Sequence, residues 1–143
     1  MERYNKKNGF AYFGAVQTNE RWSWVAATPE GDKVVITLWK HLMMGMDTER
    51  YYDTQKLMDV PASDWQNHRG NNDRIKWFKY AHDNLDSILY VLICRAKDGI
   101  ESPFEIDYCF PWIENGRLCR VKLARLCEET GHFRVEYLDS VPE

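Results

Sequence analysis

The residues of this chain with the clearest chemical potential are three tryptophans around a short turn. Trp22 and Trp24 lie two positions apart in the stretch 21–28, and Trp39 lies near the end of the stretch 33–40. On a strand, residues two apart leave the backbone on the same side. Indoles can stack on a planar group such as a nucleobase. They can equally fill a core, because each aromatic side chain buries about 150–250 Å², and composition alone favours the core interpretation.

Charged and amide side chains beside these tryptophans favour the binding interpretation. They lie just before the first stretch and at the start of a predicted helix, and they are Asn19, Arg21, Arg69, Asn71, Asn72 and Arg74. Arginines and the open N–H groups of a helix N-terminus are common partners of phosphate. We expect the three arginines to hold phosphates, and Asn71 or Asn72 to bond a base edge or the backbone. The alternative is a solvated loop whose asparagines cap and turn the chain.

Motifs for catalysis or metal binding do not stand out. The four histidines share no HxH or HxxxH spacing, and the four cysteines form no CxxC pair. The sequence also lacks nucleophilic triads, phosphate loops and dinucleotide fingerprints. Glu105 and Asp107 alternate along a predicted strand, which is typical of a solvated face. We therefore predict that the protein is not an enzyme and binds no metal and no cofactor.

The length of 143 residues predicts a single domain, 1–143, that buries its own core. Aromatic residues make up 14% of the chain, which is its main deviation from an ordinary globular composition. The net charge of −3 does not favour nucleic-acid binding overall, although a local basic patch can support it. Without an apolar leader or a run of about 20 apolar residues, we expect a cytoplasmic protein with no membrane contact and reduced, buried thiols.

The pattern of apolar residues predicts an α+β protein with one main helix. Strands over 21–28 and 33–40 are expected to form a hairpin around the turn 29–32. The nearly continuous apolar run 87–96 predicts a central strand buried on both faces. Further strands are expected over 10–17, 104–110, 117–127 and 132–138. This mixed order predicts a small, curved, mostly antiparallel β-barrel, and residues 1–9 are expected to be frayed.

The region between the hairpin and the helix has no sustained periodicity. Its aromatic residues favour an ordered, functional loop over 41–72, with a short helix near 53–58. The main helix is expected over 73–83, with Asn72 as its N-cap.

Four segments together resemble a known family. RWSWVAA, VVITLWK, NNDRIKWFKYA and LICRAKD resemble the N-terminal modules of HNH nucleases that restrict modified DNA. In those modules a W-S-W-x-A hairpin precedes an R-I helix and a strand that ends in A-K-D. The modules are similar to the PUA-like group, which includes the EVE, ASCH and SRA domains. The resemblance covers about residues 10–98. It implies a curved β-barrel with flanking helices and an aromatic pocket that receives a modified base, often flipped out of its helix.

Carried over residue by residue, the shared pattern falls on Arg21, Trp22, Ser23, Trp24, Trp39, Asn72, Arg74, Ile75, Lys97 and Asp98. The resemblance implies a module that binds DNA with methylated or hydroxymethylated cytosine, with Trp22, Trp24 or Trp39 stacked on the base and Lys97 as a further nucleic-acid-binding residue. This chain lacks the HNH motif, so it does not cut DNA by that chemistry, and a separate nuclease is the implied partner.

Two other functions stay open at this point. One is a protein-interaction module that works with a separate nuclease or another partner, a role that the acidic balance and the aromatic loop 41–71 would suit. The other is a binder of a small nucleotide-like ligand, which free modified nucleosides would stabilise.

Overall fold

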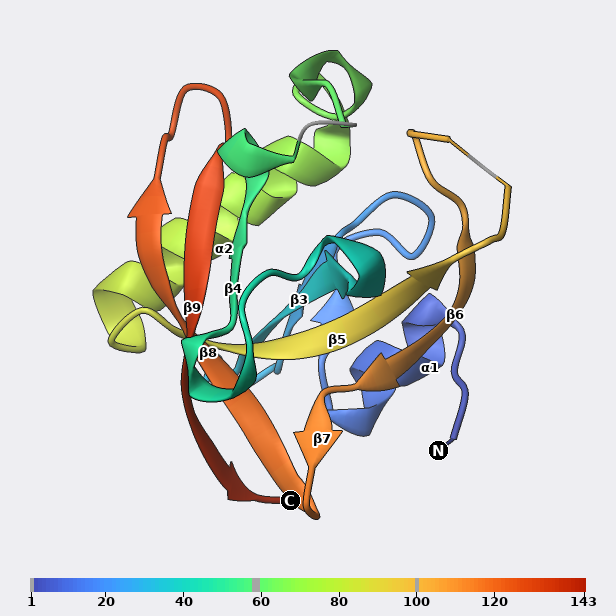
Figure 1. Ribbon diagram of the computed structural model, residues 1–143. Coiled ribbons are helices and arrows are strands. Elements are labelled where there is room, and N and C mark those ends of the chain that lie inside the picture. Colours follow the sequence, from blue (N-terminus) through green and yellow to red (C-terminus); the bar gives the residue numbers. More distant parts are fainter. Residues whose placement is uncertain (1, 58–59, 100) are drawn as a thin grey trace.

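A nine-stranded, mostly antiparallel sheet forms the body of the protein, in a computed structural model that describes residues 2–57, 60–99 and 101–143 (Figure 1). The strands are β1 (Val16–Gln17), β2 (Val25–Ala27), β3 (Val34–Trp39), β4 (Tyr51–Asp53), β5 (Ile88–Ala96), β6 (Ile106–Pro111), β7 (Ile113–Glu114), β8 (Arg117–Leu126) and β9 (Phe133–Pro142). Their order is β1-β2-β3-β5-β8-β9-β4, with β6 paired to β5 and β7 paired to β8. Among the strand pairs of these described residues, β3 and β5 are the only parallel one. The α+β class and the mostly antiparallel sheet are confirmed. The sheet is not closed, so the predicted barrel is not confirmed.

Two α-helices lie on opposite sides of the central strands, as Figure 1 shows on either side of β5. They are α1 (Lys6–Tyr12) and α2 (Arg69–Asn84). In β5, Val91 and Ile93 join the core that contains Phe78 of α2, whereas Leu92 joins the core that contains Phe10 of α1. Successive strand residues point to opposite faces, so both faces of β5 are buried and the prediction for 87–96 is confirmed. Each fully buried apolar side chain contributes about 1.5–3 kcal/mol.

The N-terminal segment differs from its prediction. Residues 6–12 are helical, and only Val16–Gln17 of the expected strand 10–17 is extended. The side chain of Asn5 caps α1 by accepting a hydrogen bond from the Asn8 N–H at 2.8 Å. Residues three apart share a helix face, which lets Phe10 and Phe13 enter one core. Tyr4 exchanges two backbone hydrogen bonds with Cys109, so the described part of 1–9 is not frayed.

The predicted hairpin is present but shorter than expected. Strands β2 and β3 pair in antiparallel register around the turn that contains Gly31. Residues 19–23 form a tight turn instead of a strand, closed by a hydrogen bond from the Ser23 N–H to the Asn19 carbonyl at 3.0 Å. Trp22 therefore lies outside the strand, and the prediction that Trp22 and Trp24 share one strand face is wrong.

Helix α2 begins four residues before its predicted start. His68 is the N-cap, and its Nδ1 accepts a hydrogen bond from the Gly70 N–H at 2.9 Å. Asn72 lies inside the first turn and is exposed, so the prediction that it caps the helix is wrong. Histidine is not among the preferred N-cap residues, and therefore sequence propensity did not indicate it.

Acid is expected to weaken this cap. Burial, aided by the charges of Lys6 and Arg69, lowers the pKa of His68 below its usual value. Between the folded and unfolded pKa values the unfolded chain binds more protons, so stability falls as the pH drops. We expect the Tm to decrease by a few degrees between about pH 8 and about pH 5, where histidine titrates. In His68→Asn, which keeps a capping acceptor without titrating, thermal scans should show a smaller decrease.

A matched control for this prediction is His82→Gln, because His82 is an exposed histidine of the same helix that does not cap it. An unchanged pH dependence in His68→Asn would show that the cap does not contribute to acid sensitivity.

The segment between β3 and α2 is ordered over its described residues, as predicted. It contains β4 and the 3-10 turns Lys40–Leu42, Asp47–Glu49, Thr54–Lys56 and Ala62–Asp64. The turn at 54–56 covers part of the expected short helix at 53–58, of which Met58 lies outside the described residues. β4 pairs with β9, and the buried Asp53 forms ion pairs with Arg125 at 2.7 Å and Arg134 at 3.4 Å. These contacts hold the segment against the sheet.

Across the described ranges, the helices are too short or too polar to pass through a lipid bilayer.

Candidate functional site

An aromatic cavity of about 440 Å³ lies between the end of β3, helix α2 and the segment that follows β3. Its aromatic side chains are Trp24, Trp39, Tyr52, Trp65 and Phe104. The volume falls within the range of roughly 300–1,000 Å³ that is typical of small-molecule sites. The three indoles come from three separate parts of the chain, so only the folded structure assembles this wall.

Arg74 of α2 is the most unusual residue of the aromatic cavity, because it is 8% exposed and lies among rings. Its guanidinium carbon is 4.9 Å from the ring centroid of Trp24, 5.6 Å from that of Trp65 and 4.8 Å from that of Phe133. One terminal nitrogen donates a long hydrogen bond, 3.4 Å, to the side-chain oxygen of Asn71. The Nε–H is buried and has no hydrogen-bond partner in the described parts of the chain. The guanidinium therefore has unused donor capacity.

The charge of Arg74 has no counter-ion within the described residues. No carboxylate there lies within ion-pair distance of it, and the buried acid Asp53 is paired with two other arginines. Burial lowers the pKa of Arg74 to about 10. Burial also raises the pKa of the neighbouring Tyr52, which therefore stays neutral. Contacts with the rings offset part of the desolvation cost, but an unpaired buried charge still costs several kcal/mol.

A bound group with a carbonyl or anionic oxygen would supply the missing partner of Arg74.

The other charged side chains of the cavity are two lysines and two acids. Lys6 and Lys97 add two cations to the lining, and the acids are Asp64 and Glu105. Ser102 donates a hydrogen bond to Asp64, which occupies one of the two carboxylates. The cavity is thus apolar on its ring faces and has a cationic excess at its polar positions.

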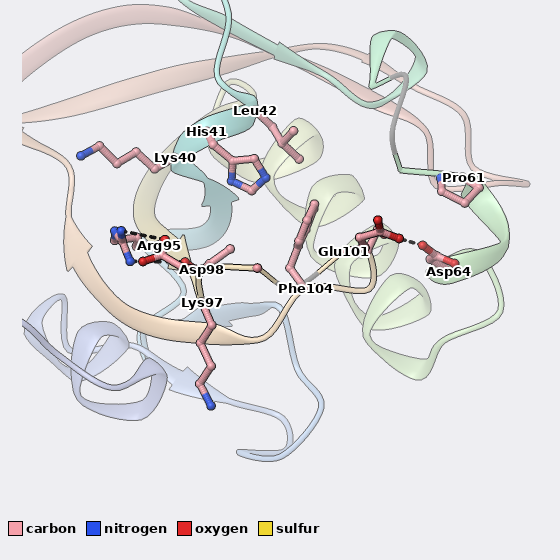
Figure 2. Close-up of a pocket in the computed structure, with 13 residues that line it drawn as sticks. Lys40, His41, Leu42, Pro61, Asp64, Arg95, Lys97, Asp98, Glu101 and Phe104 are labelled. Atoms are coloured by element: carbon pink, nitrogen blue, oxygen red, sulfur yellow. Dashed lines mark hydrogen bonds and ion pairs between the residues drawn. The ribbon is translucent and has the colours of Figure 1, made fainter.

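A wider and more open cavity of about 950 Å³ adjoins the aromatic cavity and shares Phe104 and Lys97 with it (Figure 2). Figure 2 shows Phe104 standing between Arg95 with Asp98 on one side and Glu101 with Asp64 on the other. Arg95 is already paired with Asp98 at 3.1 Å and with Asp107, so its charge is compensated. A ligand could therefore reach the rings of the aromatic cavity through this wide cavity, in which the charge of Arg95 is balanced by its acid partners.

Comparisons with known proteins give no independent guide to this site. No family model, curated protein or solved structure matches the chain. The resemblance to PUA-like modules stays a prediction based on the sequence motifs, and the chemistry of the cavity is inferred from its own residues.

Four of the ten predicted binding residues line the aromatic cavity, namely Trp24, Trp39, Arg74 and Lys97. The other six line neither cavity, and they are Asn19, Arg21, Trp22, Arg69, Asn71 and Asn72. Trp22 instead lies beneath Arg69, whose guanidinium carbon is 5.9 Å from the ring centroid. Arg74 is buried in a cavity wall, and therefore it does not present its charge on an exposed phosphate-binding surface.

Asn71 and Asn19 form hydrogen bonds within the fold, and neither has the ligand-binding role that the sequence predicted. The amide nitrogen of Asn71 donates hydrogen bonds to the carbonyls of Gln66 and Thr130, both at 2.9 Å, and its oxygen accepts from Arg74. Both polar groups of the Asn71 side chain therefore have partners within the protein, and the side chain is not free to bond a base. The side chain of Asn19 accepts a hydrogen bond from the Arg21 N–H within its own turn. These are the capping and turning roles of the alternative interpretation.

Sequence reasoning missed several cavity residues, above all Trp65, Tyr52 and Lys6. Trp65 and Tyr52 belong to the segment without periodicity, and Lys6 belongs to a segment that was expected to be frayed. The only available signal was the high aromatic content of 41–71. Within the described parts of the chain, no group of three or more His, Cys, Asp or Glu side chains is arranged to hold a metal ion.

Proposed function

We propose that the protein binds modified nucleic acid, specifically DNA with methylated or hydroxymethylated cytosine, and receives the base in the aromatic cavity. The observation that supports this most is the buried Arg74, which lies in a wall of indoles and has no counter-ion among the described residues. Cytosine is planar and presents a carbonyl oxygen and a ring nitrogen as hydrogen-bond acceptors, which suit a guanidinium donor. A cavity of about 440 Å³ accommodates one base but not a duplex, so the base has to leave the stack.

Trp39 is the best-placed ring to stack on the base. Trp24 is already stacked on His68, with centroids 4.6 Å apart, and has the Arg74 guanidinium over its ring. The aromatic neighbours of Trp39 meet it at steep angles instead, 57° for His41 and 66° for Phe104. Among the described residues no cation lies over Trp39. Stacking of a base on an aromatic ring contributes about 1–3 kcal/mol.

The direct test is a fluorescence titration with short duplexes that differ only in one cytosine, which is unmodified, methylated or hydroxymethylated. Burial of the extra methyl group against the rings predicts a preference of about 10-fold or more for a modified duplex. Affinity should also decrease with salt, because phosphates contribute to binding. Equal or absent binding of all three duplexes at low salt would contradict the proposal.

Trp39→Ala is expected to weaken binding of the preferred duplex by about 10- to 100-fold through loss of stacking. The matched control is Trp22→Ala, because Trp22 comes from the same region of the chain but lies outside the cavity. Both variants are measured by the same titration after their folds are compared by circular dichroism. A similar loss in both variants would show that the binding does not use the aromatic cavity.

A second candidate is the binding of a free nucleoside or nucleotide. The cavity size fits such a ligand, and the net charge of −3 gives little general attraction to a phosphate backbone. This candidate predicts that free modified nucleosides raise the Tm, with little further increase from duplex DNA.

A further inference from the structure

Two buried cysteines face each other across the β5–β6 ladder. Cys94 and Cys109 are register partners, and their sulfurs are 3.3 Å apart. The N–H and the carbonyl of Cys109 both bond to Tyr4, so the two cysteines do not exchange backbone hydrogen bonds with each other. Opposed residues of this kind have Cα atoms about 4.5 Å apart, which lies within the range that a disulfide spans. The sulfurs need to approach by only about 1.3 Å to reach bonding distance.

The surroundings of the pair favour a reactive thiolate. The hydrogen bond with Cys94 lowers the pKa of the Cys109 thiol, and the positive charge of Lys6 acts in the same direction. Lys6 belongs to α1, and it lines the aromatic cavity together with Cys94. A small solute in that cavity therefore meets Cys94 beside an ammonium group, whereas Cys109 lies behind Cys94 and does not line the cavity. Both cysteines are otherwise buried. A lowered thiol pKa, a nearby cation and access for the oxidant all favour the oxidation of cysteines, and here the cavity gives that access at Cys94.

We propose that Cys94 and Cys109 form an oxidation site, in which a small peroxide that enters through the aromatic cavity converts the two thiols into a cross-strand disulfide. Cys94, which lines the cavity, attacks one peroxide oxygen through Sγ as its thiol proton is released, the O–O bond breaks, and the leaving hydroxide takes up that proton to form water. Cys94 is then a sulfenic acid. The Cys109 thiolate attacks Cys94 Sγ, the S–O bond breaks, and the second oxygen leaves as hydroxide, which takes up the Cys109 proton to form water. One hydrogen peroxide is reduced to two waters, and two thiols are oxidised to one disulfide.

The other two cysteines provide internal controls. Cys119 lies beside Glu114, and burial together with the charge of this acid raises its thiol pKa to about 11. Cys127 is half-buried near the end of β8. Within the described residues, neither sulfur lies in contact with a second cysteine. If the short distance between two sulfurs decides which cysteines form a disulfide, peroxide should link Cys94 with Cys109 and leave Cys119 and Cys127 unlinked.

The test treats the folded full chain with about equimolar hydrogen peroxide, then alkylates the remaining thiols in denaturant and maps the peptides by mass spectrometry. We expect two thiols to be lost and the peptides with Cys94 and Cys109 to be linked, two hydrogens lighter than their sum. Closing this loop should raise the Tm by several degrees, and a thiol reductant should reverse the shift. Lys6→Met should slow the oxidation several-fold.

Cys119→Ser and Cys127→Ser should still form the link, and Cys94→Ser should not. The peptide map of the wild-type protein shows whether Cys94 and Cys109 are linked, even if a variant fails to fold. The proposal is overturned if both cysteines remain alkylatable while Cys127 oxidises, or if the link forms equally fast in the urea-unfolded chain. It does not depend on the proposed DNA binding, because neither readout uses a ligand.

Discussion

Arg74→Met is expected to weaken ligand binding strongly while leaving the unliganded protein at least as stable as the wild type. Arg74 is 8% exposed, and within the described residues it has no carboxylate partner and its Nε–H has no acceptor, so a ligand oxygen would gain a charge-assisted hydrogen bond from it. Loss of that bond should weaken binding by about 10- to 100-fold, since hydrogen bonds to charged groups contribute about 1.5–3 kcal/mol. Methionine keeps an unbranched apolar stem and carries no buried charge, so the folded protein avoids the desolvation cost. Titration with the preferred ligand and urea unfolding measure the two effects.

Opposite signs for binding and stability distinguish a functional arginine from a structural one. Lys76→Met is the matched control, because Lys76 is an exposed cation of the same helix, and it should change neither quantity much. Arg74→Lys should recover only part of the binding, because lysine lacks the planar fork of donors. If Arg74→Met unfolds the protein or lowers its stability by several kcal/mol, the arginine serves the packing of Trp24, Trp65 and Phe133 instead.

Gly70→Ala is expected to destabilise the protein by about 1–3 kcal/mol through overpacking, although alanine is the better helix former by about 1 kcal/mol. A methyl group at Gly70 would lie 2.6 Å from the carbonyl oxygen of Trp22 and 2.7 Å from two indole carbons of Trp24. Neither the backbone of Trp22 nor the stacked Trp24 ring can move freely, so the start of α2 has to shift. Urea unfolding measures the change in free energy.

The shift should also reach the aromatic cavity, because Trp24 lies in its wall. We therefore expect weaker ligand binding in Gly70→Ala together with the lower stability. Asn72→Ala is the matched control, since Asn72 is exposed in the same helical turn and should become neutral or slightly more stable. If Gly70→Ala is stabilised like Asn72→Ala, the close approach of α2 to the two tryptophans does not constrain the site.

These predictions share one structural origin, the crossing of the first turns of α2 over the start of the hairpin. Gly70 permits the close approach, His68 caps the helix and stacks on Trp24, and Arg74 follows one turn later in the cavity wall. A residue that positions the helix therefore also positions the guanidinium. This coupling explains why a change in packing and a change in ligand binding are expected together.

Local patterns in the sequence were sufficient for the elements whose burial is regular. The apolar run 87–96 predicted a strand covered on both faces, because alternate residues of β5 serve two cores. The turn around Gly31 predicted the hairpin of β2 and β3. Most of α2 was also predicted from its apolar stripe, and four of the residues that the sequence named as binding candidates, Trp24, Trp39, Arg74 and Lys97, line the aromatic cavity.

Segments with mixed signals were predicted less well. The stretch 10–17 has apolar residues that fit either a strand or a helix, and the capping by Asn5 together with the burial of Phe10 selected the helix α1. Propensity also overlooked His68, because its capping depends on a neutral ring placed against Trp24.

What the sequence determined by itself was the α+β class, the buried central strand and the presence of tryptophan and arginine near the hairpin. Only the tertiary structure decided that Arg74 is buried with no counter-ion among the residues that the structure describes, that Trp65 and Lys6 join the same cavity, and that Cys94 faces Cys109. The physical reason is that periodicity specifies which side of an element is buried. Which distant side chains then meet depends on strand order, on register and on where the intervening loops close.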